Sequence, residues 1–183
     1  MKNAILLHGT GSNPNSFWFP IITHFLRNRG YETWIPFLPK CEDPDLKIQL
    51  PFILERGKFS EETVIIAHSA GCPLTLALLE EIDVKIEKAI LVAGFIKPLK
   101  AFPRAKTILK KTYNFATIQK HCAEFFIINS TDDPWGCDDK QGKLIFDNLG
   151  GTLIIKNGHG HMGSREFNQP YEKFPLVEKL MEL

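Results

Sequence analysis

Short runs of apolar residues recur along the chain and alternate with helical stretches. Most of these runs are continuous rather than alternating with polar residues, which is typical of strands covered on both faces of a parallel sheet. Glycine and proline separate the segments: Gly30 follows the first helical stretch, and Pro36 ends the second strand. The pattern predicts strands at residues 4–7, 32–35, 63–67, 88–92, 125–129 and 152–155, and helices at 17–29, 46–56, 70–81, 138–149 and 171–181.

Strands joined by crossover helices predict an open α/β fold, with a six-stranded parallel sheet between two helical layers. Residues 1–183 contain no repeat, low-complexity segment or linker, so we expect a single domain. Residues 95–121 are irregular to helical and rich in Lys and Phe, and we interpret them as a minimal cap. Folds of this class bind ligands at the carboxyl ends of their strands. We expect residues 37–45 and 95–121 to shape the pocket there.

Composition and charge exclude several classes of partner. The 183 residues carry a formal net charge of +1, with acids and bases mixed along the chain, which gives no indication of binding to nucleic acid or to an anionic membrane. The apolar run at residues 4–7 is too short for a signal-peptide core or a membrane span. Four widely spaced cysteines without a Cys-x-x-Cys pair indicate free thiols in a reducing cytoplasm. No pattern indicates an oligomeric state.

One strand leads directly into Ala67–Gly71, with the sequence Ala-His-Ser-Ala-Gly, and a helical stretch follows. A strand, a tight turn of small residues around a serine and a helix are typical of a nucleophile elbow. The full motif has glycine where this chain has Ala67, a difference of one methyl group. A serine at this place also fits a simple helix N-cap. The polar loops that follow the other strands distinguish between these two interpretations.

Polar loops follow three strands in an informative order. Ser69 follows the third strand, residues 130–135 with two aspartates follow the fifth, and residues 157–163 with two histidines follow the sixth. Ser, Asp and then His is the chain order of the α/β-hydrolase triad. Taken alone, Asp-Asp-Pro also fits an ordinary turn, and Gly-His-Gly-His fits a mobile loop or a pair of metal ligands. The agreement of three loops favours the triad.

The chain resembles the small serine hydrolases of the RBBP-9/YdeN type, within the α/β-hydrolase superfamily. The resemblance covers nearly the whole length and rests on the glycine loop after the first strand, the Trp-Phe-Pro sequence at 18–20, residues 30–39, the serine turn, the Asp-Asp-Pro sequence and the final Gly-His loop. It implies a compact α/β-hydrolase-like sandwich with strand order 2-1-3-4-5-6. It also implies a Ser-Asp-His triad without a metal, and a small cap in place of a large lid.

The resemblance assigns three catalytic roles. Ser69 matches the nucleophile, and Asp133, directly before the proline, matches the triad acid, while Asp132 is expected to hold the turn. Two histidines compete for the role of base. The family pattern Gly-x-Gly-His and the distance from the last strand both favour His161, which leaves His159 as a residue lining the pocket.

Backbone amides are expected to complete the site. The N–H of Ala70 and, by the family resemblance, that of Thr10 would form the oxyanion hole. His68 is expected to pack or hydrogen-bond locally rather than act as a base. Further residues that follow strand ends are candidates for the substrate pocket: Gly9, Gly11, Phe95, Trp135 and Met162.

These residues predict a cytoplasmic serine hydrolase that cleaves a small ester or related acyl substrate through an acyl-enzyme intermediate. No cofactor is required, and the expected partner is a small acyl molecule. Two alternatives remain open at this point. The first is a non-catalytic protein-interaction module on the same fold. The second is a metal-dependent hydrolase that uses His159, His161 and nearby carboxylates.

Overall fold

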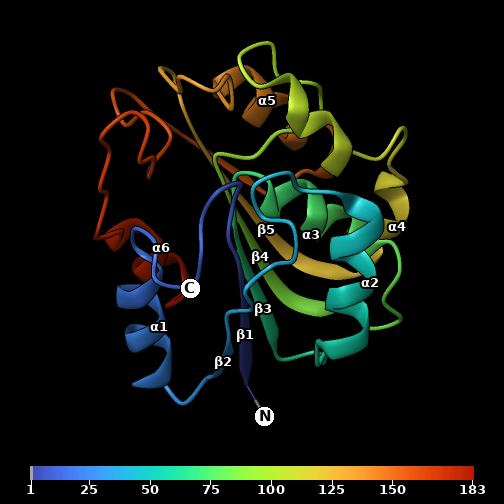
Figure 1. Ribbon diagram of the computed structural model, residues 1–183. Helices are drawn as coiled ribbons and strands as arrows, with labels where there is room; N and C mark the ends of the chain where they lie inside the picture. The colour runs from blue at the N-terminus through green and yellow to red at the C-terminus, as the bar shows by residue number, and fades with distance from the viewer. Residues whose placement is uncertain (1) are drawn as a thin grey trace.

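The computed structural model describes residues 2–183 as one parallel β-sheet flanked by helices (Figure 1). The six strands lie in the order β2-β1-β3-β4-β5-β6, and every neighbouring pair is parallel. This arrangement confirms the predicted fold class and strand order. The strands are β1 (Asn3–Leu7), β2 (Glu32–Trp34), β3 (Thr63–His68), β4 (Ile86–Val92), β5 (Cys122–Ser130) and β6 (Thr152–Lys156).

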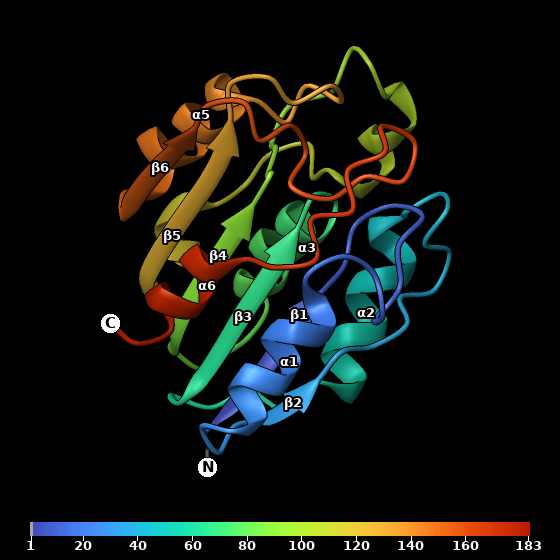
Figure 2. The same cartoon turned by 90° about the vertical axis from the view of Figure 1, so that its left-hand side faces the viewer.

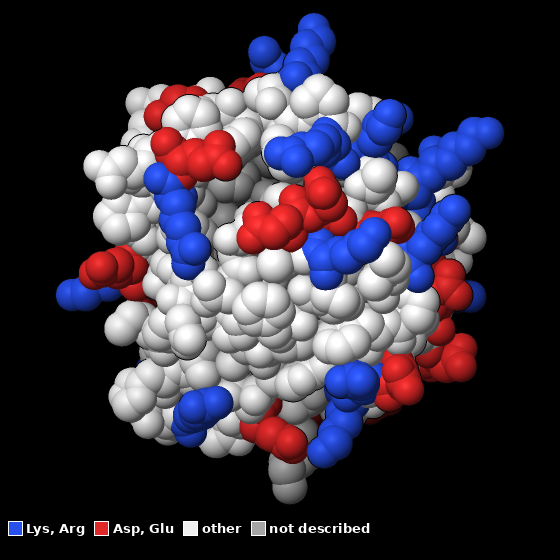
Figure 3. Space-filling model, viewed as in Figure 1, with Lys and Arg blue, Asp and Glu red and all other residues white. Residues whose placement is uncertain are grey.

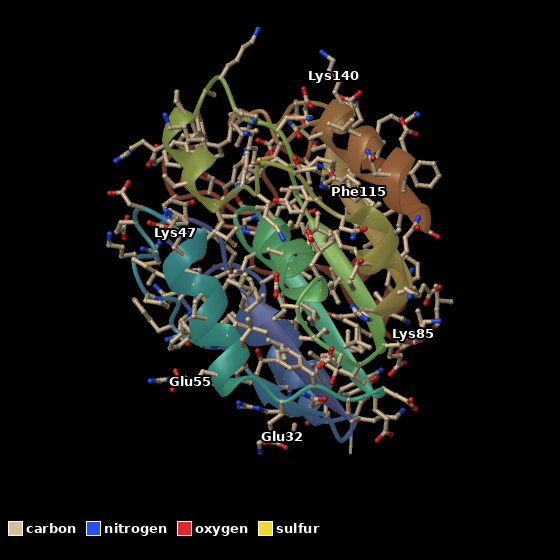
Figure 4. All side chains as sticks on the ribbon, turned by 90° about the vertical axis from the view of Figure 1, so that its right-hand side faces the viewer. Glu32, Lys47, Glu55, Lys85, Phe115 and Lys140 are labelled. Atoms are coloured by element: carbon tan, nitrogen blue, oxygen red, sulfur yellow. The ribbon has the colours of Figure 1, made fainter. Side chains whose placement is uncertain are left out.

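The helices form a layer on each face of the sheet. Figure 2 shows α1 and α6 on one face, and Figure 4 shows α2 to α5 on the other, with Lys47 and Glu55 marking the two ends of α2. The bounds are α1 (Phe19–Arg27), α2 (Leu46–Arg56), α3 (Gly71–Leu79), α4 (Phe115–Lys120), α5 (Asp139–Leu149) and α6 (Pro175–Leu180), with a 3₁₀ helix η1 (Pro103–Ile108).

The core follows from the apolar runs. Every residue of β3 is buried, because this central strand is covered on both faces. The nine residues of α3 are also all buried, since this helix lies between the sheet and its neighbours α2 and α4. A helix that is apolar on all sides is stable in such an interior position. The turn between β3 and α3 is thereby fixed in the centre of the molecule.

Two helices begin later than the sequence predicts. The first was expected from residue 17, but Phe17 has a φ of 53°, and α1 begins at Phe19 with a proline in its first turn. The last was expected from residue 171, but Tyr171 has a φ of 40°, and α6 begins at Pro175. Residues with positive φ cannot continue a right-handed helix. Phe17 and Trp18 before α1 belong to a turn, whereas residues 171–174 before α6 have irregular backbone.

The expected cap is smaller than residues 95–121. Its first part runs from β4 through η1 along the carboxyl edge of the sheet, where Thr107 donates a hydrogen bond to the Pro44 carbonyl at 2.6 Å. Its last part, α4, instead packs beside α3 and α5 in the helical layer. Across residues 2–183, none of the helices has the length and apolarity needed to cross a membrane. The four cysteines are free and buried.

Candidate active site

Ser69 lies in the turn between β3 and α3 with a φ of 53°, in the left-handed region that non-glycine residues rarely adopt. Its backbone amide donates to the Val92 carbonyl at 2.9 Å, which ties the turn to β4. The N-cap of α3 is Ala70, and the helix start has no side-chain cap. Within the part of the chain that the structure describes, the Ser69 hydroxyl has no hydrogen-bond partner. The N-cap interpretation of this serine is therefore wrong, and its strained strand-to-helix turn has the geometry expected of a nucleophile elbow.

Two glycines allow the backbone to approach this turn closely. A Cβ on Gly9 would lie 2.8 Å from Ser69 Cβ and 3.3 Å from Ser69 Oγ. A Cβ on Gly71 would collide with the Leu7 carbonyl oxygen. The loop after β1 thus lies directly against the serine, and α3 begins against β1. Larger residues at these two positions would push the elbow out of place.

Asp133 and His161 form a buried pair. His161 Nδ1 lies 2.6 Å from Asp133 Oδ2, and Asp133 Oδ1 accepts a hydrogen bond from the Trp135 amide at 2.8 Å. The carboxylate accepts, so Nδ1 of the neutral ring carries the proton and Nε2 keeps its lone pair. The side chain of Asp133 is fully buried and that of His161 is 7 % exposed. This pairing fixes the tautomer that a general base requires.

Asp132 joins the loop after β5 to the loop after β6. Its Oδ1 accepts from Ser130 Oγ at 2.6 Å and from the Gly160 amide at 3.1 Å. These hydrogen bonds, that of Ser130 first, lower the pKa of the Asp132 carboxyl. Ser130 Oγ in turn accepts from the His159 amide at 3.1 Å. Asp132 therefore holds the turn, as the sequence predicts.

His159 and Met162 do not line the cavity beside Ser69, although both were candidates for it. His159 Nδ1 lies 2.9 Å from the Tyr171 hydroxyl. Desolvation by burial, followed by the charge of Lys156, lowers the pKa of His159. The Met162 side chain is fully buried in the core. The sequence could not separate these two from the pocket, because they follow a strand end like the other candidates.

The cavity at the carboxyl edge has a volume of about 340 Å³ and is lined by Ser69 and His161 together. Five predicted residues line it: Gly9, Thr10, Gly11, Phe95 and Trp135. Leu99, Phe102 and Ala105 also line it and belong to residues 95–121, which were expected to shape the pocket, whereas no sequence signal pointed to the lining residue Phe17. Charged side chains also contribute, namely Glu42, Arg104, Arg165 and Glu166. Figure 3 shows acidic and basic side chains interspersed over the upper part of the molecule, where the strands end.

The amides of Thr10 and Ala70 are free donors. Neither has an acceptor among residues 2–183, although Ala70 is almost completely buried. The loop that carries Thr10 is fixed on both sides, since His8 Nδ1 lies 2.9 Å from the Gly9 carbonyl and Gly11 N donates to the Cys41 carbonyl at 2.9 Å. A buried amide without an acceptor is uncommon and suits an anion that forms only during a reaction.

One set of possible metal ligands occurs in the described part of the chain. Ligand atoms of Asp133, Cys137 and His161 lie within 4.8 Å of one another, and all three residues are buried. His159 is not part of this set. Burial raises the pKa of the Cys137 thiol, and a thiol must lose its proton to bind a metal well. Among the described residues, no set of three or more candidate metal ligands includes both His159 and His161.

Known proteins resemble this chain over most of its length. The family model described as serine hydrolase matches residues 4–182. YdeN of Bacillus subtilis (strain 168) is 27 % identical over 135 residues, which cover 72 % of this chain and 71 % of that protein. The serine hydrolase RBBP9 of Rattus norvegicus is 28 % identical over 123 residues, covering 67 % of this chain and 64 % of that protein.

Solved structures show the same fold. The crystal structure of the ydeN gene product from B. subtilis superposes with a TM-score of 0.91 at 24 % identity, covering 100 % of this chain and 97 % of that one. Est1E from Butyrivibrio proteoclasticus, solved with ferulic acid bound, has a TM-score of 0.69 at 15 % identity and is covered to 88 % by the whole of this chain. Because the family model spans residues 4–182, the chain belongs to the serine hydrolase family.

Proposed function

We propose that this hydrolase cleaves a small ester or related acyl substrate with Ser69 as nucleophile, His161 as base and Asp133 as the acid that orients the base. One observation carries the proposal. Ser69, strained in its elbow and without a hydrogen-bond partner for its hydroxyl among residues 2–183, shares a cavity with a histidine whose Nδ1 is bound to a buried carboxylate. Strained backbone at a free nucleophile is typical of a reacting site.

The reaction would proceed in two halves. His161 Nε2 takes the proton of the Ser69 hydroxyl as the oxygen attacks the carbonyl carbon of the substrate. The amides of Thr10 and Ala70 stabilise the oxyanion of the tetrahedral intermediate. When the intermediate collapses, the proton on Nε2 passes to the leaving oxygen, and the acyl group stays on Ser69. Water then attacks the acyl-enzyme, with His161 accepting and returning a proton as before.

Ser69 and His161 make no direct hydrogen bond in this structure, whose described residues leave the serine hydroxyl free. Catalytic hydrogen bonds are often long in the empty enzyme and tighten when substrate binds. Rotation of the serine about χ1 between staggered rotamers moves Oγ without moving the backbone. We expect this rotation to accompany binding.

The cavity favours a small substrate with an apolar part. Its volume of about 340 Å³ lies at the lower end of the range found for small-molecule pockets. Phe95, Leu99 and Trp135 supply apolar surface. The charged residues that line the cavity are exposed to solvent, namely Glu42, Arg104, Arg165 and Glu166. The size and the apolar lining of the cavity therefore suit a short or branched acyl ester.

Labelling with a fluorophosphonate, followed by peptide mass mapping, tests the proposal. We expect an adduct on Ser69 in the wild type and none in Ser69→Ala or His161→Ala. His159→Ala is the matched control and should label normally, since His159 lies outside the cavity. An unlabelled but folded wild type would contradict the proposal and would favour the non-catalytic interaction module. Loss of hydrolysis on adding a chelator, without serine labelling, would favour the metal-dependent alternative.

A further inference from the structure

Two consecutive carbonyls of the loop after β6 accept hydrogen bonds from buried aromatic side chains. His68 Nε2 lies 2.9 Å from the His161 carbonyl oxygen. Trp18 Nε1 donates to the Met162 carbonyl oxygen at 3.0 Å. Both donor residues are buried, and they come from the end of β3 and from the turn before α1. The peptide of the candidate base is thus held by segments far away in the sequence.

His68 acts here as a neutral donor. A carbonyl oxygen can only accept, so Nε2 of His68 must carry the proton. Its other nitrogen, Nδ1, is then a buried acceptor that has no partner among residues 2–183. Burial and the neighbouring His161 lower the pKa of His68 to about 3. The ring therefore remains uncharged across the neutral range.

The loop that these donors hold has an unfavourable backbone. Met162 has a φ of 52°, in the left-handed region that a methionine rarely adopts. The His161 amide donates to Gln169 Oε1 at 2.8 Å, so both polar groups of this residue's backbone are bound. Strained backbone of this kind persists only where the surroundings hold it in place.

We propose that His68 and Trp18 are positioning residues, which fix the backbone of His161 so that its ring meets Asp133 and faces the cavity beside Ser69. The inference rests on the proposed function of His161 as the base. His68 is also the chain neighbour of Ser69, at the last position of β3. One rigid strand end therefore carries the nucleophile and anchors the base, which sets the spacing between them.

Packing alone does not account for a histidine at position 68. The His68 ring lies among aromatic rings, with centroids 4.8 Å from His161, 5.9 Å from Trp18 and 6.0 Å from Phe17. An apolar ring would fill this space without leaving a buried nitrogen unpartnered, which is costly. What a histidine adds at this position is the N–H that holds the His161 carbonyl.

Four variants separate positioning from folding. Trp18→Phe keeps an aromatic ring but removes the N–H donor together with part of the indole volume, and His68→Leu removes the donor from the other carbonyl. His68→Gln restores a donor at that position and serves as the rescue. Trp34→Phe is the matched control, because Trp34 stacks on Phe52 at the far edge of the sheet and its indole N–H makes no hydrogen bond within residues 2–183.

Steady-state hydrolysis of p-nitrophenyl acetate gives the first readout. We expect kcat to fall about 10- to 100-fold in Trp18→Phe and His68→Leu, with KM within about threefold, because misplacing a catalytic group by about 1 Å costs rate on this order. His68→Gln should recover most of the loss, and Trp34→Phe should behave as the wild type. Unchanged kcat in both donor variants would overturn the proposal, as would equal losses in His68→Leu and His68→Gln.

The second readout does not depend on turnover. In ¹⁵N-labelled protein, the Nδ1 proton of His161 should give a strongly downfield ¹H signal, because it is bound to a buried carboxylate at 2.6 Å. We expect this signal to weaken or disappear in His68→Leu and Trp18→Phe while the far-ultraviolet circular dichroism stays unchanged. An undisturbed signal would overturn the positioning role. A wild type that shows the signal but no fluorophosphonate adduct would instead refute the proposed function.

Discussion

Gly9→Ala is expected to damage the site without unfolding the protein. The new Cβ would stand 2.8 Å from Ser69 Cβ, whereas ordinary van der Waals contact begins at 3.4 Å. The loop must therefore move by roughly 0.6 Å, the difference between these two distances. The same loop carries Thr10, whose amide is one of the two expected oxyanion donors.

The expected losses of kcat and of stability in Gly9→Ala follow from two known effects. Loss of one oxyanion donor costs about 100- to 1,000-fold in kcat, and a shift of 0.6 Å removes only part of its contribution. We therefore expect kcat for a p-nitrophenyl ester to fall about 10- to 100-fold. Overpacking should lower the free energy of unfolding by about 1–3 kcal/mol.

Gly30→Ala is the matched control. Gly30 has a φ of 81° and no atom within 4 Å of an added Cβ, so alanine is strained there but touches nothing near the site. We expect this variant to lose about 1–2 kcal/mol of stability and to keep wild-type kcat. A Gly9→Ala enzyme with wild-type kcat would refute the reasoning, because it would show that the loop does not depend on its contact with Ser69.

Three further predictions concern the interior. Asp133→Asn should fold normally but lose about 10³- to 10⁴-fold in kcat, since the amide would favour the wrong tautomer of His161; a loss below tenfold would contradict this role. Cys72 and Cys137 should resist iodoacetamide until denaturant is added, because burial raises the pKa of both thiols. In the folded protein His68 has a pKa of about 3 and stays uncharged above that pH, whereas in the unfolded chain it takes up a proton near pH 6.5. The free energy of unfolding should therefore decline as the pH falls from about 6.5 towards 3, by up to about 1.4 kcal/mol per pH unit. The decline should be smaller in His68→Gln. Chemical denaturation at several pH values measures it, and an equal decline in the wild type and in His68→Gln would contradict the prediction.

The sequence predicted the architecture well because its strongest signals are local. Continuous apolar runs such as that of β3 define buried strands, and the loops that follow them must meet at one edge. From these two signals we predicted that Ser69, Asp133 and His161 lie together at the carboxyl edge of the sheet. The prediction failed for the starts of α1 and α6, where Phe17 and Tyr171 adopt positive φ.

The contacts that hold the site could not be predicted in the same way. Trp18 and Met162 are 144 positions apart, and nothing in either segment indicates the hydrogen bond between them. His159 follows the end of β6 by three residues and His161 by five, and the ring of His159 turns to Tyr171. The difference depends on the direction of a side chain in a strained loop, which periodicity does not encode.

The four charged residues at the cavity consist of two acids and two bases: Glu42, Arg104, Arg165 and Glu166. Their fields largely cancel for a substrate that approaches from several ångströms away, so diffusional encounter is not steered by long-range attraction. The second-order rate constant kcat/KM for a charged ester should then stay nearly constant between low and physiological ionic strength. An enzyme of this kind would gain its selectivity only after contact, from the fit of the acyl group to the walls of the cavity.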